Sequence, residues 1–213
     1  MAQSTPEIRA ERRRLRALRL AMPRPRRVAA ERAIIAALRR LRVLRRGRRV
    51  AVYLAMPGEV SLAGALPGAL RLGVELYAPQ IRSRRLLQMR FVRLRGGATL
   101  RPNAFGIEEP AAAERQWSPP GRLDLVLVPV VGFDRDGNRL GMGAGYYDRA
   151  LRRRRDGARN WRRPRLVGLA FACQEVAKIE PSPWDVRLDL VVTERAIVVP
   201  RRATAAPGQE DSA

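Results

Sequence analysis

Residues 123–131 constrain the fold more than any other part of the chain. They read LDLVLVPVV, an almost continuous apolar run rich in β-branched residues. Such a run is typical of a strand buried on both faces of a parallel sheet, because helices cover both faces of these sheets. The carboxyl end of a parallel strand faces a ligand crevice. We therefore expect an α/β protein whose binding site begins where this run ends.

A glycine-rich loop and the start of a helix follow this run. Residues 134–137 (DRDG) are typical of a turn, residues 139–145 (RLGMGAG) have a glycine at every second position from Gly141, and a helical pattern opens at Tyr146. Alternating glycines let backbone N–H groups converge on an anion, and a helix N-terminus adds its positive dipole end. The loop is neither a P-loop nor a dinucleotide fingerprint. A tight turn needs fewer glycines, so the pattern favours a phosphate site.

Hydrophobic periodicity alternates strands with helices, which indicates an α/β fold with a mainly parallel sheet flanked by helices. We expect helices at 7–20, 26–46 and 146–155, with a short one starting at Ser61. Residues 96–121 read as loops, and the polar tail 201–213 is expected to be disordered after a single domain of residues 1–200. The expected strands are 49–55, 74–79, 86–94, 123–131, 166–172, 190–193 and 196–199.

The chain contains no histidine and one cysteine, Cys173. This excludes Ser-His-Asp and Cys-His catalysis, histidine-ligated metals and internal disulfides. Cys173 has no base partner in its pattern and is interpreted as structural. Any chemistry must use carboxylates, arginine, tyrosine, backbone amides, a bound metal or a cofactor.

The formal net charge of +23 raises the question of nucleic-acid binding. Of the 43 basic residues only Lys178 is a lysine, and the arginines are spread along the chain. Codon bias explains this near-total use of arginine in place of lysine better than selection for phosphate affinity, because lysine and arginine both bind phosphate. No nucleic-acid-binding motif accompanies the charge. We therefore expect a basic cleft suited to a polyanion such as ATP, and no specific nucleic-acid partner.

The string RLGMGAGYYDR at 139–149, behind an apolar strand and a D-x-x-G turn, closely resembles the motif of the 5-formyltetrahydrofolate cyclo-ligase family, also called 5,10-methenyltetrahydrofolate synthetases. Other segments resemble that family in the same order, from about residue 12 to residue 199. They are RRRLR at 12–16, VYLAMPGEV at 52–60, NAFGIEEP at 103–110, VGLAFACQEV at 167–176 and PWDVRLDLVVT at 183–193.

This resemblance implies an ATP-dependent ligase that closes the formyl group of 5-formyltetrahydrofolate onto N10, giving 5,10-methenyltetrahydrofolate, ADP and phosphate through a phosphorylated formyl intermediate. It also implies the α/β fold shared with ribose-5-phosphate isomerase and CoA transferases. Two other classes stay open on the residues alone. One is an RNA-binding protein, which would explain the charge, and the other is a CoA- or sugar-phosphate-binding relative, which would explain the glycines.

The resemblance implies catalytic roles for Arg139 and Tyr146. Arg139 precedes the glycines, where a guanidinium could grip a transferring phosphate, although a solvated arginine is the ordinary case in so basic a chain. Arg12 and Arg16, four residues apart, lie on one helix face. The residues expected to bind ATP are Arg12, Arg13, Arg14, Leu15, Arg16, Arg139, Leu140, Gly141, Met142, Gly143, Ala144, Gly145, Tyr146 and Tyr147.

The folate pocket and a magnesium site are likewise implied. In a chain with 5% aromatic residues, a tyrosine pair beside a glycine loop favours a ring-binding pocket. Phe105 is interpreted as a loop anchor. Asp148 and Asp185 are the implied Mg²⁺ ligands, with Asp189 a competitor for the second position, since Mg²⁺ needs only one or two carboxylates beside phosphate oxygens and water. The residues expected to bind folate are Leu54, Glu59, Met142, Gly143, Ala144, Gly145 and Tyr146.

No apolar run is long enough to span a bilayer, so no membrane partner is expected. The first thirty residues are arginine-rich, which is also a feature of mitochondrial presequences. The expected functional role of Arg12 and Arg16 argues against cleavage there. We therefore expect a cytoplasmic enzyme, and a monomer.

Overall fold

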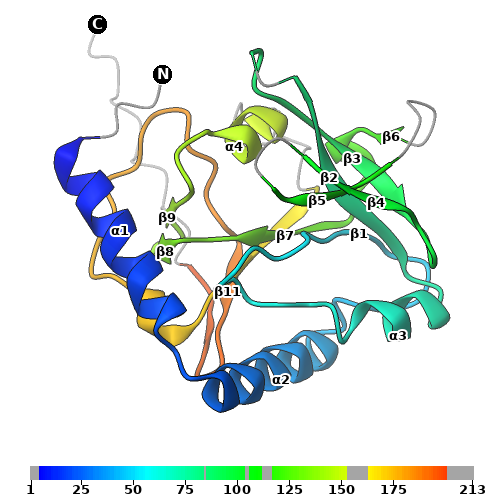
Figure 1. Ribbon diagram of the computed structural model, residues 1–213, viewed down its shortest axis with the longest axis horizontal. Helices are drawn as coiled ribbons and strands as arrows, with labels where there is room; N and C mark the ends of the chain where they lie inside the picture. Colours follow the sequence, from blue (N-terminus) through cyan, green and yellow to red (C-terminus); the bar gives the residue numbers. More distant parts are fainter. Residues whose placement is uncertain (1–4, 84, 104–105, 112–116, 153–162, 201–213) are drawn as a thin grey trace, which may run out of the picture.

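A central eight-stranded sheet organises the structure (Figure 1). The computed structural model describes residues 5–83, 85–103, 106–111, 117–152 and 163–200. The strand order is β12-β11-β10-β7-β1-β2-β3-β6, and the five strands from β11 to β2 are parallel. The strands are β1 (Arg49–Ala51), β2 (Glu75–Ser83), β3 (Gln88–Leu94), β6 (Trp117–Ser118), β7 (Leu125–Pro129), β10 (Arg165–Leu169), β11 (Leu190–Val192) and β12 (Ile197–Val198). The prediction of an α/β fold with a mainly parallel sheet is therefore confirmed.

The strand β7 lies at the centre of the sheet and is buried on both faces, as its apolar run predicts. Leu125 and Leu127 point to one face, and Val126 and Val128 to the other. The pairing of β7 with β1 on one side and β10 on the other is parallel. This arrangement brings the carboxyl ends of three strands to one edge.

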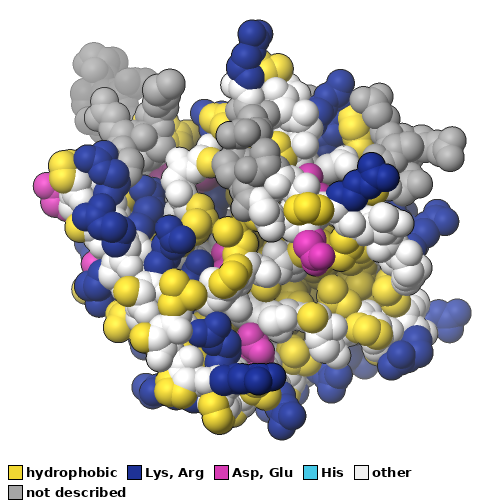
Figure 2. All heavy atoms as spheres, viewed as in Figure 1, with side chains coloured by type: hydrophobic (Ala, Val, Ile, Leu, Met, Phe, Trp, Pro, Cys, Tyr) yellow, Lys and Arg dark blue, Asp and Glu magenta, His cyan; other side chains and the backbone are white. Residues whose placement is uncertain are grey.

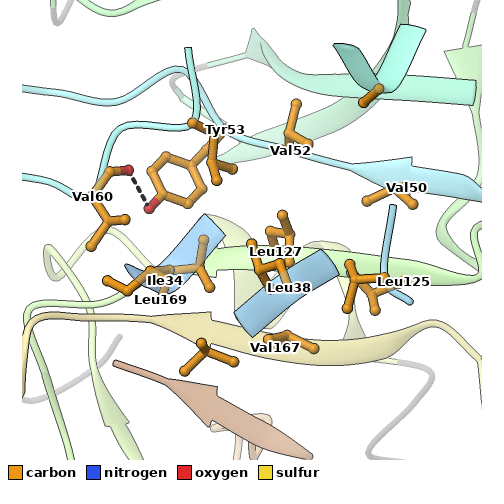
Figure 3. Close-up of a cluster of buried hydrophobic side chains, with 14 of the residues drawn as sticks. Ile34, Leu38, Val50, Val52, Tyr53, Val60, Leu125, Leu127, Val167 and Leu169 are labelled. Atoms are coloured by element: carbon orange, nitrogen blue, oxygen red, sulfur yellow. Dashed lines mark hydrogen bonds between the residues drawn. The ribbon is translucent and has the colours of Figure 1, made fainter. Parts of the chain in front are cut away.

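Helices α2 (Arg24–Arg40) and α3 (Leu66–Arg71) cover one face of the sheet (Figure 1). Ile34 and Leu38 of α2 are completely buried against side chains of β1, β7 and β10 (Figure 3). Burying a side chain of this size stabilises the fold by roughly 1.5–3 kcal/mol. Tyr53, just after β1, extends this core, and its hydroxyl donates to the carbonyl of Val60 at 2.8 Å.

The other face is covered by the short helix α4 (Tyr146–Ala150) and by the segment that leads into β11. Leu151 and Val186 pack there against Val126 and Val128 of β7. Figure 1 shows α4 and α2 on opposite sides of the sheet. The glycine-rich loop that precedes α4 is thereby fixed to the sheet face.

Helix α1 (Pro6–Leu20) lies beside a two-stranded hairpin of β8 (Gly132–Phe133) and β9 (Arg139–Leu140) (Figure 1). Thr5 caps the helix, since its side chain accepts a hydrogen bond from the Ile8 N–H at 3.3 Å. Leu15 is fully buried against Leu140 and its neighbours. Helix α1 is therefore anchored to this hairpin and to the 3-10 helix η3 (Ala172–Gln174).

Several predicted boundaries were wrong. The second helix begins at Arg24 and ends at Arg40, and Arg42, with φ 53°, adopts a conformation that a helix does not allow. The helix expected from Ser61 begins instead at Leu66, with a proline in its first turn, where the missing N–H costs nothing. The block 96–121, predicted as loops, also holds β4 (Leu100–Pro102), β5 (Glu108–Pro110), β6 and the 3-10 helix η2 (Pro120–Arg122).

Other predictions fall outside the described residues. They concern the tail 201–213, Phe105, and residues 153–155 of the helix expected at 146–155. The described part of that helix ends at Ala150, earlier than predicted, with Leu151 as its C-cap. None of the described helices is long and apolar enough to cross a membrane.

Candidate functional site

A cavity of about 620 Å³ lies at the carboxyl ends of the parallel strands. Tyr53 and Leu54, which follow β1, line it, as do Pro129 at the end of β7 and Ile81 in β2. Its volume lies in the range of ordinary small-molecule sites, roughly 300–1,000 Å³. It occupies the position at which open α/β sheets bind their ligands. This is the place that the apolar run at 123–131 predicted.

The hairpin β8–β9 carries the glycine loop to the cavity, and Asp134 fixes the hairpin turn. Asp134 is only 1% exposed, and its carboxylate accepts four hydrogen bonds. The donors are the backbone N–H groups of Asp136, Asn138 and Ile179 and the Asn138 side-chain amide, at 2.9–3.0 Å. A carboxylate with four donors is well satisfied without water. The turn is therefore rigid where Arg139 leaves it.

The loop 141–145 needs glycine at two positions for conformational reasons. Gly143 has φ 102° and Gly145 has φ 70°, both in the left-handed region that favours glycine. Gly145 is also the N-cap of α4. All seven residues from Leu140 to Tyr146 line the cavity, so the backbone of the loop faces a prospective ligand.

Arg139 and Asp148 form an ion pair at the cavity wall. An Arg139 nitrogen lies 2.5 Å from Asp148 Oδ1, and the two side chains are 6% and 21% exposed. A second Arg139 nitrogen donates to the Val186 carbonyl, and the Val186 N–H donates to the same Asp148 oxygen at 3.0 Å. Both side chains are therefore held in place before any ligand binds. Asp148 is therefore a part-buried, ion-paired residue, and not the exposed first-turn residue that its sequence position indicates.

Asp185 and Arg12 extend this pair into a group of two carboxylates and two guanidinium groups. The pKa of Asp185 is raised above its ordinary value, mainly by burial and also by the nearby Asp148 carboxylate. Hydrogen bonding by the Ser182 N–H and the charges of Arg139 and Arg12 offset part of this rise. Arg12 donates to the Gly141 carbonyl at 2.9 Å, and burial lowers its pKa. Four charges thus converge beside the glycine loop. Asp189, the competitor of Asp185, does not line the cavity and accepts the Leu166 N–H at 2.7 Å.

Glu59 also lines the cavity, in an aromatic and apolar setting. Its side chain is 6% exposed, and burial raises its pKa. The neighbouring phenols of Tyr53 and Tyr147 also have raised pKa values because they are buried, so both are neutral. Leu54 and Met56 line the cavity beside them. This wall can accept hydrogen bonds from a flat ring edge while packing against its faces.

The structure brings most of the predicted site residues together and leaves four apart. Of the expected ATP ligands on α1, only Arg12 lines the cavity, together with Ile8 one turn earlier. The four that do not line it are Arg13, Arg14, Leu15 and Arg16. Leu15 is buried in the core, and Arg14 pairs with Glu11 at 2.6 Å.

Sequence reasoning missed a third wall of the cavity. Its residues come from β2, β3 and the β4–β5 pair, or lie near Asp185. Asn103, Ile107 and Glu108 lie in the segment NAFGIEEP, which resembles the family, but no cavity role was predicted for them. No motif marks the lining residues of β2 and β3, whereas Trp184 is adjacent to an expected ligand and could have been included. The missed lining residues include Pro79, Ile81, Met89, Asn103, Ile107, Glu108, Ile179 and Trp184.

The fold and the cavity place the chain among α/β proteins that bind small ligands at the carboxyl ends of a parallel sheet. Residues 3–194 match the model of the 5-formyltetrahydrofolate cyclo-ligase family. The chain belongs to this family.

Named relatives agree with the family match. The 5-formyltetrahydrofolate cyclo-ligase of Haemophilus influenzae is 32% identical over 193 residues, which cover 89% of this chain and 98% of that one. The enzyme of the same name from Escherichia coli K12 is 35% identical over 68% of this chain and 76% of its own.

Solved structures show the same fold. The NMR structure of 5,10-methenyltetrahydrofolate synthetase from Aquifex aeolicus superposes with a TM-score of 0.76 at 28% identity, over 95% of this chain and 97% of that one. The 5,10-methenyltetrahydrofolate synthetase of Mycoplasma pneumoniae superposes with a TM-score of 0.68 at 23% identity, over 87% and 98%. The further likeness to ribose-5-phosphate isomerase and CoA transferases stays a prediction.

Proposed function

We propose that this protein converts 5-formyltetrahydrofolate into 5,10-methenyltetrahydrofolate at the expense of ATP. The observation that carries the proposal is the pairing of two unlike walls in one cavity. A buried carboxylate beside aromatic rings, at Glu59, lines the same cavity as a glycine loop with a cluster of charges at Arg139. A reaction between a flat heterocycle and a triphosphate needs both walls in one space, because the reacting atoms must be held within about 3–3.5 Å.

In the proposed reaction the formyl oxygen attacks the γ-phosphorus of ATP and ADP leaves. N10 then adds to the activated formyl carbon, the phosphate departs with the former formyl oxygen, and the N10 proton is released. Phosphoryl transfer asks a protein mainly for positioning and for neutralisation of charge. A chain without histidine can supply both.

We assign roles by position in the cavity. Arg139, the amides of loop 141–145 and Arg12 would hold the phosphates, and Leu54, Glu59 and Tyr146 would hold the folate ring. Glu59 would accept hydrogen bonds from the amino-pyrimidine edge. The proposal includes no direct contact of ATP with four of the expected ligands, because they do not line the cavity. These are Arg13, Arg14, Leu15 and Arg16.

Asp148 and Asp185 fit a magnesium ion as a pair of carboxylates. They are close enough for the charge of Asp148 to raise the pKa of Asp185, and oxygen ligands suit Mg²⁺. Among the described residues no group of three or more metal-binding side chains occurs, so phosphate oxygens and water would complete the coordination. When bound, the ion would neutralise phosphate charge. Asp148 would share its carboxylate between that ion and Arg139.

The test is a spectroscopic assay on the purified protein with Mg-ATP and 5-formyltetrahydrofolate. We expect the methenyl-folate absorbance band to rise, with one ADP and one phosphate released per product. ATP hydrolysis without that band, or no reaction in the presence of both substrates, would overturn the proposal. The monomeric state and the cytoplasmic location stay predictions, the first of which sedimentation can check.

A further inference from the structure

Arg19, at the C-terminal end of α1, is a buried arginine in a chain whose arginines are otherwise mostly exposed. It is 2% exposed. One of its terminal nitrogens donates to the Val130 carbonyl at 3.3 Å, and the other lies 3.6 Å from Glu59 Oε1. Its Nε has no hydrogen-bond partner within the described part of the chain. A buried guanidinium is costly unless it is paired, so its place beside Glu59 requires an explanation.

The loop that carries Glu59 is built directly on Arg19. Gly58 has φ 82°, and a Cβ there would lie 3.4 Å from Arg19 Cγ and 2.9 Å from Leu20 Cδ2. The loop backbone therefore packs against the apolar stem of Arg19, as long basic side chains allow. The Met56 N–H donates to Glu59 Oε2 at 3.0 Å, which leaves Oε1 facing the guanidinium.

The electrostatic setting of Glu59 depends on few groups. Burial raises the pKa of Glu59 above its ordinary value. The Met56 N–H and the charges of Arg19 and Arg16 offset part of this rise. Tyr53 and Tyr147 also face the carboxylate, but they are neutral. Arg19 is the only one of these groups that combines a full positive charge with a contact to Glu59.

We propose that Arg19 is a positioning residue, which keeps the Glu59 carboxylate ionised and aimed at the cavity for a ligand edge with paired N–H donors. Arg19 does not line the cavity, so it acts through Glu59. The inference rests on the proposed function, in which Glu59 binds the amino-pyrimidine edge of the folate. Arg19 thus sets the pH range over which the folate binds.

The test compares Arg19→Met with the parent across pH. Without its counter-charge, Glu59 should have a higher pKa than in the parent, so a larger fraction of it is protonated at low pH. We therefore expect the KM for 5-formyltetrahydrofolate to exceed the parent value increasingly as the pH falls, by up to about tenfold per pH unit below that pKa, and to approach the parent value as the pH rises. The KM for ATP should not change. Arg32→Met, which removes an exposed arginine of α2, is the matched control.

Two further variants separate positioning from a structural role. Arg19→Lys should restore a folate KM that is nearly independent of pH, because it keeps the charge. Glu59→Gln should raise the folate KM at every pH, and adding Arg19→Met to it should cost nothing more, because the two residues act as one unit. If Arg19→Met does not fold, Arg19→Lys and the double variant, which has no buried unpaired carboxylate, carry the same comparison.

Three outcomes would overturn the inference. They are an equal rise in both KM values, a loss that does not depend on pH, and additive effects in the double variant. Equilibrium dialysis of 5-formyltetrahydrofolate over the same pH series separates a failure of the proposed function from a failure of the role of Arg19. If the parent shows no turnover, the proposed function fails, whereas folate binding that is nearly independent of pH in the parent and weakens at low pH in Arg19→Met still supports the role of Arg19.

Discussion

Asp148 connects three parts of the site through a single oxygen atom. Oδ1 accepts hydrogen bonds from Arg139 and from the Val186 N–H, so this residue ties α4 to β9 and to the segment before β11. We expect Asp148→Asn to destabilise the fold by about 1–3 kcal/mol, because it leaves Arg139 without its counter-charge in a part-buried place. This exceeds the roughly 0.3–1 kcal/mol of an exposed first-turn aspartate.

Turnover should fall far more than stability does, since Asp148 is also a proposed magnesium ligand. Urea unfolding and kcat with Mg-ATP measure the two effects, and Asp136→Asn, at an exposed carboxylate of the hairpin turn, is the control. Turnover near that of the parent would refute the magnesium assignment.

Residues within the glycine motif could be placed from the sequence, whereas those on α1 could not. The spacing of Arg12 and Arg16 predicts a shared face, but the cavity meets this helix one turn earlier, at Ile8 and Arg12. Helical periodicity gives relative directions and not the rotation of the helix about its axis. The burial of Arg19 was equally beyond prediction, because its partners are remote in the sequence.

At the scale of elements, the hairpin β8–β9 determines where Arg139 lies. Gly137 in its turn has φ 82°, and a Cβ there would lie 2.7 Å from the Leu188 carbonyl oxygen. We expect Gly137→Ala to cost at least about 1–3 kcal/mol of stability, through backbone strain and this contact. It should also lower kcat, because the turn cannot shift without moving Arg139.

Thermal unfolding and steady-state kinetics check this prediction. Gly64→Ala is the control, since Gly64 has no positive φ and open space around its Cα. An unchanged midpoint in Gly137→Ala would show that the hairpin is not the rigid support described above.

The long periodic elements were predicted, whereas the short strands β4, β5 and β6 were not. The central strand β7 and helices α1 and α2 have enough residues for a pattern to appear. Strands β4, β5 and β6 have only two or three residues each, so no alternation can distinguish them from loops. Their positions depend on pairing with distant segments, as β6 does with β3. This is why these three strands could not be predicted from the sequence.

For the whole molecule, one cluster of positive charge lies at the end of the sheet that is away from the cavity. Arg48, just before β1, interacts electrostatically with Arg45, Arg163 and Arg165, with Asp124 as the acidic neighbour. Burial and these neighbouring arginines lower the pKa of Arg48. Figure 2 shows that basic side chains also outnumber acidic ones on the face in view. The amino ends of the strands thus carry an exposed basic cluster, while the substrates are proposed to bind at the carboxyl ends.

This separation predicts that non-specific RNA binding and catalysis are independent. Replacing Arg45, Arg48 and Arg165 by glutamine should lower the slope of log affinity against log salt by about 2 for single-stranded RNA, by counterion release. It should leave the kinetics with ATP and folate unchanged. Arg139→Ala should do the reverse, because one guanidinium among 43 basic residues adds little to a diffuse field but much to one phosphate. Filter binding across a salt series and the methenyl-folate assay, run on both variants, give the comparison. A parallel collapse of RNA binding and turnover in Arg139→Ala would show that the two activities share one site.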